Sequence, residues 1–503
     1  MKIECPIRVN ARKEIEDPAI IYEGSQFSYS QLDDVLEQVE DFLTRKGIRE
    51  NNRVAVISKN SVEMVVVLWA LWRIGAVVVP LNYRFPVSYI ESILEKFRPP
   101  FVIVDECFGI TNFTNERNSF SIIELQELGE LFCRGVLRTP EKNISKRATA
   151  GRPYVRNQEG KLESSRLVIL TSGSTAAEKG VLLSFSNLYY NALGSNRNIV
   201  LEPGDRWLVS LPLFHVGGIG VLFRCFLARA AVVIPNGEES ILQSVERYSI
   251  THLSLVSTQL VRMLNELSQA RSGLFSGIKA VLLGGSAISQ ELIREAISCG
   301  LPVFTTYGMS EMGSQVTTTA PGDGLEKLKT SGKLLAFRQI KIADDLEICV
   351  KGETLFQGYI DGDGVVLPVD SDRWFHTGDL GRIDSQGYLE VIGRKDNMFI
   401  SGGENIVPEE IEAVLEGVPG IERVVVVPKV DEEFGFRPVC FIKRKELDEG
   451  GESLSEQNII EYLKGRLPGF KVPRVFYEWP SDYKDGDSLK VKRPYFKEIA
   501  KLS

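Results

Sequence analysis

A loop rich in hydroxyl and glycine residues follows an apolar run at residues 167–170. The residues in it that could surround phosphate oxygens are Thr171, Ser172, Gly173, Ser174, Thr175 and Lys179. Glycine lets backbone N–H groups approach an anion closely, the hydroxyls donate hydrogen bonds, and the lysine adds a positive charge. Counting from Gly173 places Glu178 where a Walker-type loop needs its second glycine, so that motif is excluded. The spacing predicts a phosphate-binding loop of another kind, with a surface loop that binds nothing as the alternative.

Four further clusters of glycine, hydroxyl and charged residues follow in order at 307–311, 374–381, 393–405 and 490–493. Together with the first loop, they closely resemble the ordered motifs of the acyl-adenylate-forming enzymes, a superfamily of acyl-CoA synthetases, peptide-synthetase adenylation domains and luciferases. The resemblance covers nearly the whole chain. It implies that a carboxylate is first joined to the α-phosphate of ATP, with loss of pyrophosphate, and that a thiol then takes the acyl group. The resemblance therefore implies Mg²⁺ as the cofactor and ATP and coenzyme A as co-substrates.

Length and composition suit a soluble enzyme of at least two domains. A chain of 503 residues is too long for one hydrophobic core. Its formal net charge of -8 argues against a nucleic-acid partner or an anionic membrane surface, so the substrate should be small. The family resemblance implies that this small molecule is a carboxylic acid. The cysteines show no C-x-x-C spacing, so free thiols in a reducing compartment are expected. The sequence leaves open whether the protein is a monomer or a homo-oligomer.

The sequence contains no stretch that predicts a targeting or membrane segment. Residues 1–6 lack the apolar segment of a secretion signal. The most apolar stretch, residues 62–81, is interrupted by Arg73 and Gly75, which predicts a buried helix followed by a strand instead of a membrane span. We therefore expect a cytoplasmic protein without membrane insertion.

Strand-like apolar runs alternate with helical patterns along most of the chain. Residues 53–57 and 77–79 predict two strands with a helix between them. Residues 280–283 and 303–304 repeat this pattern around a helix expected at 289–298. Such alternation predicts an α/β fold of mostly parallel sheets with helices on both faces.

The C-terminal part of the chain predicts a smaller unit. Pro408 and the two glutamates after it are typical of a helix start. Residues 424–427 predict a buried strand, and 456–464 a second helix. The family resemblance implies an N-terminal AMP-binding and acyl-binding domain at 1–395 and a small, mobile α+β lid domain at 396–503, joined by a hinge.

The resemblance also implies roles for single residues. Lys490 matches the lysine that bridges the substrate carboxylate and the α-phosphate, and a lysine of a solvated tail is the alternative interpretation. Glu311 matches the Mg²⁺ ligand and Asp396 the hinge. Asp379 matches the acceptor for ribose hydroxyls, with a surface salt bridge as the alternative, and Arg394 matches a donor to ribose or phosphate. Further nucleotide contacts implied are Gly284, Gly285, Ser286, Tyr307 as the adenine-stacking ring, Gly308 and Ser310.

The run at 211–218 resembles the motif that forms the acyl pocket and the thiol approach in this superfamily. The acyl-binding candidates are Phe214, His215, Gly217, Gly218 and Arg224. His215 is also a catalytic candidate, with a structural histidine as the alternative. Arg224 lies in an apolar stretch and could recognise a second substrate carboxylate, because a buried carboxylate without donors is costly. A structural ion pair and an exposed arginine are the alternatives for Arg224.

Residues 307–317, 327–335 and 400–406 most resemble the branch of the superfamily that activates o-succinylbenzoate, a dicarboxylic acid of menaquinone biosynthesis. Within the last of these, Gly402 and Gly403 match a glycine loop that lines the passage for coenzyme A. Aryl-CoA and some fatty acyl-CoA ligases share that loop, so an aryl- or medium-chain acyl-CoA ligase is an alternative. From other classes, a non-catalytic acyl-adenylate-binding homologue and a peptide-synthetase adenylation domain remain as alternatives.

Overall fold

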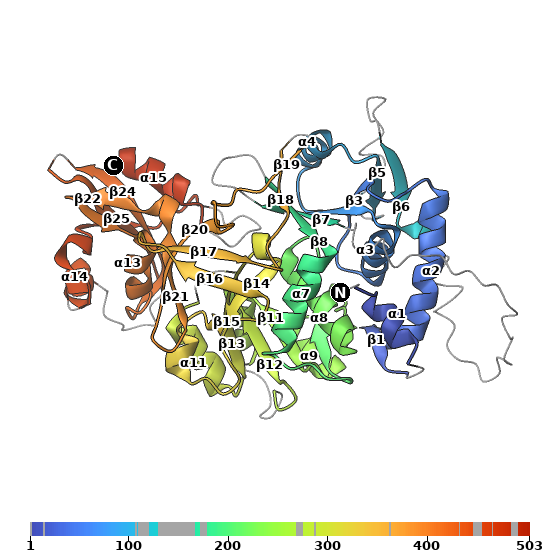
Figure 1. Ribbon diagram of the computed structural model, residues 1–503. Coiled ribbons are helices and arrows are strands. Elements are labelled where there is room, and N and C mark those ends of the chain that lie inside the picture. The colour runs from blue at the N-terminus through green and yellow to red at the C-terminus, as the bar shows by residue number, and fades with distance from the viewer. Residues whose placement is uncertain are drawn as a thin grey trace, which may run out of the picture.

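The computed structural model describes most of the chain, in an α/β arrangement (Figure 1). The described residues are 3–13, 16–105, 108, 120–128, 166–171, 179–267, 275–285, 288–361, 364–431, 433–445, 455–464, 466–483 and 491–502. The site predictions for Ser172, Gly173, Ser174, Thr175, Ser286 and Lys490 lie outside the described residues.

Two large sheets carry most of the described strands. One has the order β15 (Lys333–Leu334), β14 (Ser314–Thr318), β13 (Val303–Met309), β12 (Ala280–Leu283), β11 (His252–Leu255), β9 (Arg206–Leu208), β10 (Ala231–Val233), β1 (Pro18–Tyr22) and β2 (Ser25–Ser28). The other has the order β19 (Gly364–Val366), β18 (Gly358–Asp361), β8 (Lys179–Ser184), β7 (Arg166–Thr171), β4 (Val77–Leu81), β3 (Arg53–Ile57), β5 (Phe101–Val104) and β6 (Ser121–Glu124). Neighbours are parallel from β1 to β13 and from β7 to β6, which confirms the predicted sheet type.

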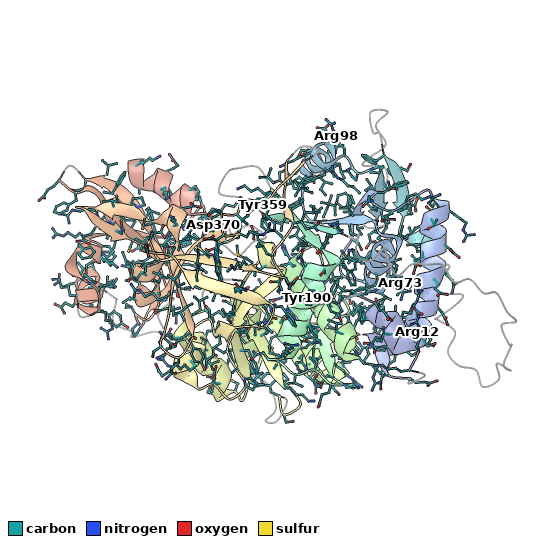
Figure 2. All side chains as sticks on the ribbon, viewed as in Figure 1. Arg12, Arg73, Arg98, Tyr190, Tyr359 and Asp370 are labelled. Atoms are coloured by element: carbon teal, nitrogen blue, oxygen red, sulfur yellow. The ribbon has the colours of Figure 1, made fainter. Side chains whose placement is uncertain are left out.

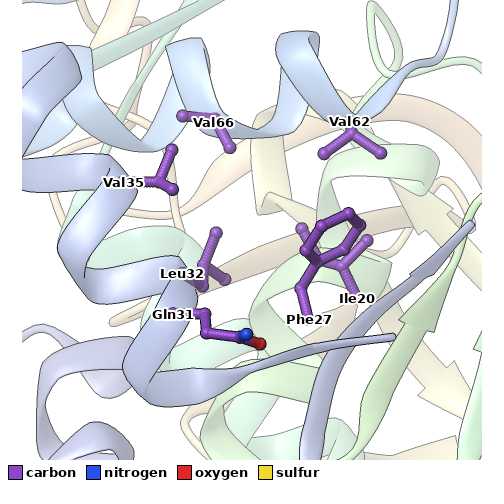
Figure 3. A pocket seen from close by; sticks show the side chains of 7 residues that line it. All are labelled: Ile20, Phe27, Gln31, Leu32, Val35, Val62 and Val66. Carbon is purple, nitrogen blue, oxygen red and sulfur yellow. The ribbon is translucent and has the colours of Figure 1, made fainter. Parts of the chain in front are cut away.

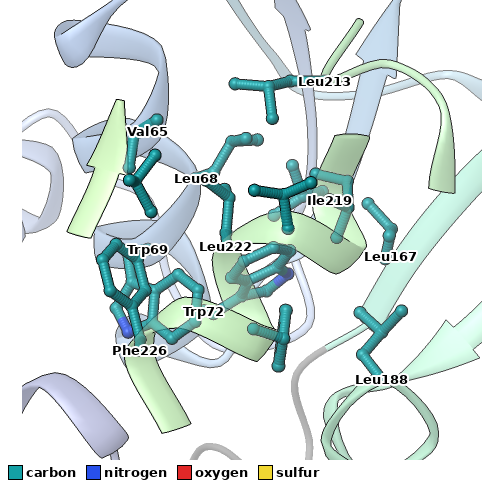
Figure 4. Close-up of a cluster of buried hydrophobic side chains, with 14 of the residues drawn as sticks. Val65, Leu68, Trp69, Trp72, Leu167, Leu188, Leu213, Ile219, Leu222 and Phe226 are labelled. Carbon is teal, nitrogen blue, oxygen red and sulfur yellow. The ribbon is translucent and has the colours of Figure 1, made fainter. Parts of the chain in front are cut away.

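Three helices, α3 (Val62–Ile74), α7 (Phe185–Asn196) and α8 (Val216–Ala228), lie between the two sheets and form the main core (Figure 4). Trp69 of α3 is at its centre, with ring centroids 5.2 Å from Trp72 and 4.9 Å from Phe226 of α8. Strand residues alternate between faces as the pleat requires. Ile20 packs into this core, whereas Ile21 packs into a second cluster on the outer face.

The outer faces of both sheets are also covered by helices. The outer cluster of the first sheet includes α9 (Ile241–Tyr248), α10 (Ser257–Leu267) and α11 (Gln290–Ser298), and that of the second includes α4 (Val87–Phe97). The other helices that the structure describes in this region are α1 (Pro6–Ala11), α2 (Tyr29–Arg45), α12 (Leu325–Leu328) and the 3₁₀ turn η3 (Ser310–Met312). The expectation of helices on both faces is confirmed. Among the described residues, no helix combines the length and apolarity that crossing a membrane needs.

The predicted β3–α3–β4 unit shows how local sequence determines these elements. Ser61 caps α3 by accepting a hydrogen bond from the Met64 N–H at 3.1 Å. Gly75 ends the helix with φ 86°, a left-handed conformation that glycine adopts without strain. The helix is buried on nearly every face, because it lies between two sheets.

A third, antiparallel sheet was not predicted from the sequence. Its order is β16 (Arg338–Ile342), β17 (Glu347–Gly352), β20 (Phe375–Ile383) and β21 (Leu389–Arg394). It brings the motif at 374–381 beside the motif at 393–405, because Asp379 and Arg394 are cross-strand partners. The turn η4 (Lys395–Asn397) follows directly.

Residues beyond η4 pack around their own hydrophobic clusters, which contain only residues from Phe399 onward among those described. The strands are β22 (Phe399–Ser401), β23 (Glu404–Ile406), β24 (Ile421–Asp431), β25 (Gly435–Arg444) and β26 (Val475–Glu478). The helices are α13 (Pro408–Leu415), α14 (Glu456–Lys464), α15 (Arg493–Leu502) and the turn η5 (Gly469–Lys471). The predicted helix starting at Pro408, the strand at 424–427 and the helix at 456–464 are confirmed.

Candidate active site

Three predicted nucleotide-binding residues meet where β13 approaches the antiparallel sheet. The Tyr307 hydroxyl donates to Asp379 Oδ2 at 2.6 Å, and Arg394 Nη1 donates to Asp379 Oδ1 at 2.8 Å. Arg394 Nη1 also donates to the Thr377 carbonyl at 3.2 Å. Burial, and after it the charge of Asp379, raise the pKa of the Tyr307 phenol well above its ordinary value, so this hydroxyl stays protonated and keeps donating. Both carboxylate oxygens of Asp379 are thus held in place.

Glu311 forms a second polar centre with a residue that sequence reasoning missed. Its Oε1 accepts a hydrogen bond from the Tyr359 hydroxyl at 2.7 Å. Tyr359 (labelled in Figure 2) lies on β18 and pairs with Val181 of β8. Burial and the nearby Glu311 raise the pKa of the Tyr359 phenol, which keeps it a donor. Lys179 Nζ lies 5.3 Å from the centroid of the Tyr359 ring, within cation–π range.

The two ends of the predicted phosphate loop lie beside this centre. Thr171 ends β7 and is the antiparallel partner of Lys179 at the start of β8. Glu311 itself lies in η3, which directly follows β13, and its backbone carbonyl accepts from the Phe356 N–H at 2.7 Å. Residues on either side of the loop therefore lie close to the carboxylate proposed to hold a metal.

The predicted adenine-side glycines lie at the same edge of the first sheet. Gly284 and Gly285 directly follow β12, and Gly308 and Ser310 belong to the end of β13 and the turn after it. The two strands are parallel neighbours, with Leu283 opposite Thr305, so their carboxyl ends share one edge. This is the edge where open α/β sheets bind ligands.

The acyl motif at 211–218 forms the turn before α8 and the first residues of that helix. Asn60, from the turn after β3, accepts from the Leu213 N–H at 2.9 Å and donates to the Leu211 carbonyl at 2.9 Å. His215 is the N-cap residue of α8, and its exposed ring lies 4.7 Å from the ring of buried Phe214. Gly217 lies next to Leu211, and a Cβ at Gly218 would overlap the Pro212 carbonyl.

Arg224 on α8 is 1% exposed and has no ion-pair partner among the described residues. Its Nε and Nη1 atoms lack hydrogen-bond partners there, and Nη2 reaches only Ser314 Oγ at 3.5 Å. Its Cζ lies 5.1 Å from the Trp207 ring centroid. Burial lowers the pKa of the guanidinium to about 10, so it stays charged at neutral pH. Both alternatives from the sequence, an exposed arginine and a structural ion pair, are therefore wrong for the described structure.

Arg73 (labelled in Figure 2) is a buried arginine with ion-pair partners, and it serves as a comparison for Arg224. It is 2% exposed, and its Nη1 donates to Glu40 Oε1 at 3.1 Å. Its Nη2 pairs with Asp33. Two carboxylates thus compensate Arg73, whereas the described residues supply none for Arg224. A buried guanidinium with free donors indicates a place for an anionic ligand.

The hinge candidate Asp396 lies two residues after Arg394, whose Nη2 donates to Asp396 Oδ2 at 3.3 Å. Lys395 between them is held on the antiparallel sheet, because its Nζ donates to Asp345 at 2.7 Å and to Glu347 at 2.9 Å. This anchors the chain just before the proposed pivot.

Gly402 and Gly403 form the two-residue turn between β22 and β23, with φ of 58° and 89°. Positive φ at both central residues is what the commonest hairpin turn requires, and glycine meets it without strain. The Gly402 N–H donates to the Phe434 carbonyl at 2.9 Å, which fixes the turn against the β24–β25 hairpin.

One small pocket lies apart from the motif residues. It lies between β1, β2, α2 and α3 and is lined by apolar side chains and Gln31 (Figure 3). No group of three or more His, Cys, Asp or Glu side chains in the described ranges could hold a metal by itself. The described cysteines are free, and Cys5, Cys225, Cys349 and Cys440 are buried.

Comparison with known families identifies the class of protein. The AMP-binding enzyme model matches residues 7–360, and the model of the AMP-binding enzyme C-terminal domain matches residues 410–484. The chain belongs to the AMP-binding enzyme family. A relative from Bacillus cereus, a 2-succinylbenzoate–CoA ligase, is 31% identical over 467 residues, which cover 91% of this chain and 90% of the relative.

Solved structures of an o-succinylbenzoate CoA synthetase from Bacillus subtilis are similar over the whole chain. Its complex with the acyl-adenylate intermediate has a TM-score of 0.81 at 28% identity and covers 98% of this chain and 97% of that one. Its complex with ATP and magnesium ion has a TM-score of 0.80 at 28% identity, covering 98% and 99%. A double mutant bound to a product analogue has a TM-score of 0.65 at 28% identity, covering 98% of both chains.

Proposed function

We propose that this protein is an ATP-dependent acid–thiol ligase that converts 2-succinylbenzoate and coenzyme A into 2-succinylbenzoyl-CoA, AMP and pyrophosphate. Family membership and the 2-succinylbenzoate–CoA ligase relative support the reaction type. The observation that carries the acid specificity is Arg224, a buried cation with unused donors on α8, the helix that begins within the acyl motif. A dicarboxylic acid presents a second, unreactive carboxylate that such a cation would bind.

At the nucleotide end, Asp379 accepts hydrogen bonds from the ribose hydroxyls. The contacts to Tyr307 and Arg394 support this role, because they fix both carboxylate oxygens before a nucleotide arrives. Arg394 has further donors for ribose or phosphate. The phosphate contacts come from the loop at 171–175, Lys179 and Ser310, and the adenine lies between the Tyr307 ring and the backbone at Gly284, Gly285, Ser286 and Gly308.

Glu311 is the protein ligand for Mg²⁺, which neutralises phosphate charge when bound. The donor set fits this ion, because Tyr359 occupies Oε1 and no described residue donates to Oε2. Magnesium held mainly by phosphates and water needs only one or two protein carboxylates, in agreement with the lack of a larger acidic cluster in the described ranges. Tyr359 orients the Glu311 carboxylate through its hydrogen bond.

At the acyl end, Arg224 binds the ring carboxylate of the substrate, and the succinyl carboxylate faces the α-phosphate. Phe214 and His215 form an aromatic wall of the acyl pocket, and Gly217 and Gly218 let the turn pack closely against Leu211 and Pro212 behind it. In the first step an oxygen of the succinyl carboxylate bonds to the α-phosphorus as pyrophosphate leaves. Lys490 stabilises the charge shared by the two anions, and catalysis is mainly positioning and neutralisation.

In the second step the sulfur of coenzyme A bonds to the acyl carbon, AMP leaves and the thiol proton passes to solvent. Residues 396–503 form a lid that turns about Asp396 between the two steps. This movement takes Lys490 out of the active site and brings the Gly402–Gly403 turn to it. The TM-scores support two arrangements, since one Bacillus subtilis protein scores 0.81 as the acyl-adenylate complex and 0.65 with a product analogue. The free cysteines suit a cytoplasmic enzyme.

The test is pyrophosphate release from ATP in the presence of coenzyme A and a panel of acids. We expect 2-succinylbenzoate to exceed benzoate, octanoate and amino acids in kcat/KM. A monocarboxylate preferred by about tenfold or more would refute the proposal, since that ratio is about 1.4 kcal/mol of discrimination in the wrong direction.

A further inference from the structure

A second buried arginine, Arg338, lies at the start of β16 and is 5% exposed. Its Nε donates to the Gln315 carbonyl at 2.8 Å, Nη1 to the Ala336 carbonyl at 2.6 Å, and Nη2 to the Asn191 carbonyl at 3.0 Å. All three acceptors are neutral backbone groups. Arg338 is therefore a second buried cation that no carboxylate compensates within the described part of the chain, in contrast to Arg73.

Two helix glycines make room for the two guanidinium groups. A Cβ at Gly194 of α7 would overlap the Arg338 guanidinium. A Cβ at Gly220 of α8 would lie 3.0 Å from Arg224 Nη2. Glycine is a poor helix former, and alanine would be the better residue in both helix interiors. Both helices thus contain a glycine, which has low helix propensity, at the position where a buried guanidinium group packs.

The hydrogen bonds of Arg338 connect it to the surroundings of Arg224. The Gln315 carbonyl accepts from Arg338 and also from Asn191 Nδ2 at 3.0 Å. The preceding residue is Ser314, whose Oγ lies 3.5 Å from Arg224 Nη2. Ser314 has φ of 122°, a backbone conformation that is rare outside glycine. Arg338 thus holds the backbone next to the hydroxyl that contacts Arg224.

The two cations also influence each other electrostatically. Burial, and after it the positive charge of Arg224, lower the pKa of Arg338 to about 9. Both guanidinium groups remain charged at neutral pH, and their repulsion is weakly screened in the interior. An anion bound beside Arg224 would be attracted by both charges, whereas a neutral group would leave both uncompensated.

We propose that Arg338 is a positioning residue for acid specificity, which supplies the second buried positive charge of the acyl subsite and fixes the backbone at Ser314 and Gln315. The subsite then selects acids that carry a second carboxylate. The inference rests on the proposed function and deepens it, because it assigns the selectivity to a pair of arginines instead of Arg224 alone.

The test compares two acids that differ in one carboxylate. These are 2-succinylbenzoate and 4-oxo-4-phenylbutanoate, which lacks the ring carboxylate but keeps the reacting chain. ATP–pyrophosphate exchange is measured for both with the wild type, Arg338→Met and Arg338→Lys. We expect Arg338→Met to lower kcat/KM for the dicarboxylate by about tenfold or more, mainly through KM, and for the monocarboxylate by less than about threefold. Arg338→Lys, which keeps the charge, should retain most of the selectivity.

The outcomes separate this inference from the function on which it rests. If Arg338→Met lowers kcat/KM equally for both acids, so that their ratio is unchanged, the role of Arg338 is overturned. The proposed function still stands in that case, provided that the wild type prefers the dicarboxylate. A wild type without preference for the dicarboxylate would overturn both. If melting curves show that Arg338→Met does not fold, Arg338→Gln takes its place, because its amide still donates to backbone carbonyls without the charge. Arg73→Met is the matched control, and its ratio between the two acids should equal that of the wild type.

Discussion

Replacing Arg224 with methionine removes a buried charge but keeps an unbranched side chain of similar length among the apolar residues of α8. The lowering of its pKa to about 10 through burial corresponds to about 3 kcal/mol of unfavourable free energy for the charged form. The cation–π contact with the Trp207 ring, 5.1 Å from Arg224 Cζ, stabilises the charged form by about 2 kcal/mol. The two contributions nearly cancel. Ligand-free Arg224→Met should therefore be as stable as the wild type or up to about 1 kcal/mol more stable.

In contrast to its stability, the activity of Arg224→Met toward 2-succinylbenzoate should fall strongly. The ring carboxylate of 2-succinylbenzoate would lose the charge-assisted hydrogen bonds from Arg224 Nε and Nη1, which have no other partner among the described residues. Leaving one member of a buried charge pair alone costs about 3–5 kcal/mol, so kcat/KM for this acid should fall by about 10²- to 10⁴-fold. The value for 4-oxo-4-phenylbutanoate, which lacks that carboxylate, should change by less than about threefold.

The assay pairs ATP–pyrophosphate exchange for both acids with a melting curve of the ligand-free protein. Arg73→Met is the control, because Arg73 is buried to a similar extent but paired with Glu40 and Asp33. It should lower the melting temperature without changing the ratio between the two acids. A clear loss of stability in Arg224→Met together with equal losses for both acids would refute the reasoning, since Arg224 would then be structural.

Two further predictions concern the half-reactions. Lys490→Ala should lower acyl-adenylate formation by about two to three powers of ten, while thioester formation from supplied acyl-adenylate suffers much less. Equal losses in both half-reactions would mean that the lysine is structural or that Lys492 is the catalyst. Asp396→Pro should keep substantial ATP–pyrophosphate exchange but lose most CoA-thioester formation, because proline restricts φ at the proposed pivot. The residue lies in the first turn of η4, where proline is tolerated, and a melting curve checks the fold. Parallel changes in both half-reactions would show that Asp396 makes only a local turn.

Elements determined by neighbouring residues were predictable from the sequence. The strands β3, β4, β12 and β13 and the helix α11 follow from apolar runs and caps, and α13 begins with Pro408 as its composition indicates. The helix coverage of both parallel sheets follows from the alternation of these elements. Capping and hydrophobic periodicity act over a few residues, so a single sequence contains the information they need.

Contacts between distant segments were not predictable in the same way. Tyr359 lies 48 residues after Glu311 and has no motif of its own, so its hydrogen bond to that carboxylate became visible only in the structure. Arg338 reaches the Asn191 carbonyl across 147 residues. The isolation of Arg224 depends on the absence of carboxylates among its described neighbours, which no local pattern encodes. The antiparallel sheet that pairs Asp379 with Arg394 was missed because buried and exposed residues alternate only weakly along its strands.

The central claim is that the enzyme recognises the second carboxylate of its acid substrate. The most direct measurement is the kcat/KM of the wild-type protein for 2-succinylbenzoate and for 4-oxo-4-phenylbutanoate, each followed to the CoA thioester. We predict a preference for the dicarboxylate of about a hundredfold or more, equivalent to about 2.7 kcal/mol or more of transition-state discrimination. Equal values for the two acids, or a preference for the monocarboxylate, would contradict it.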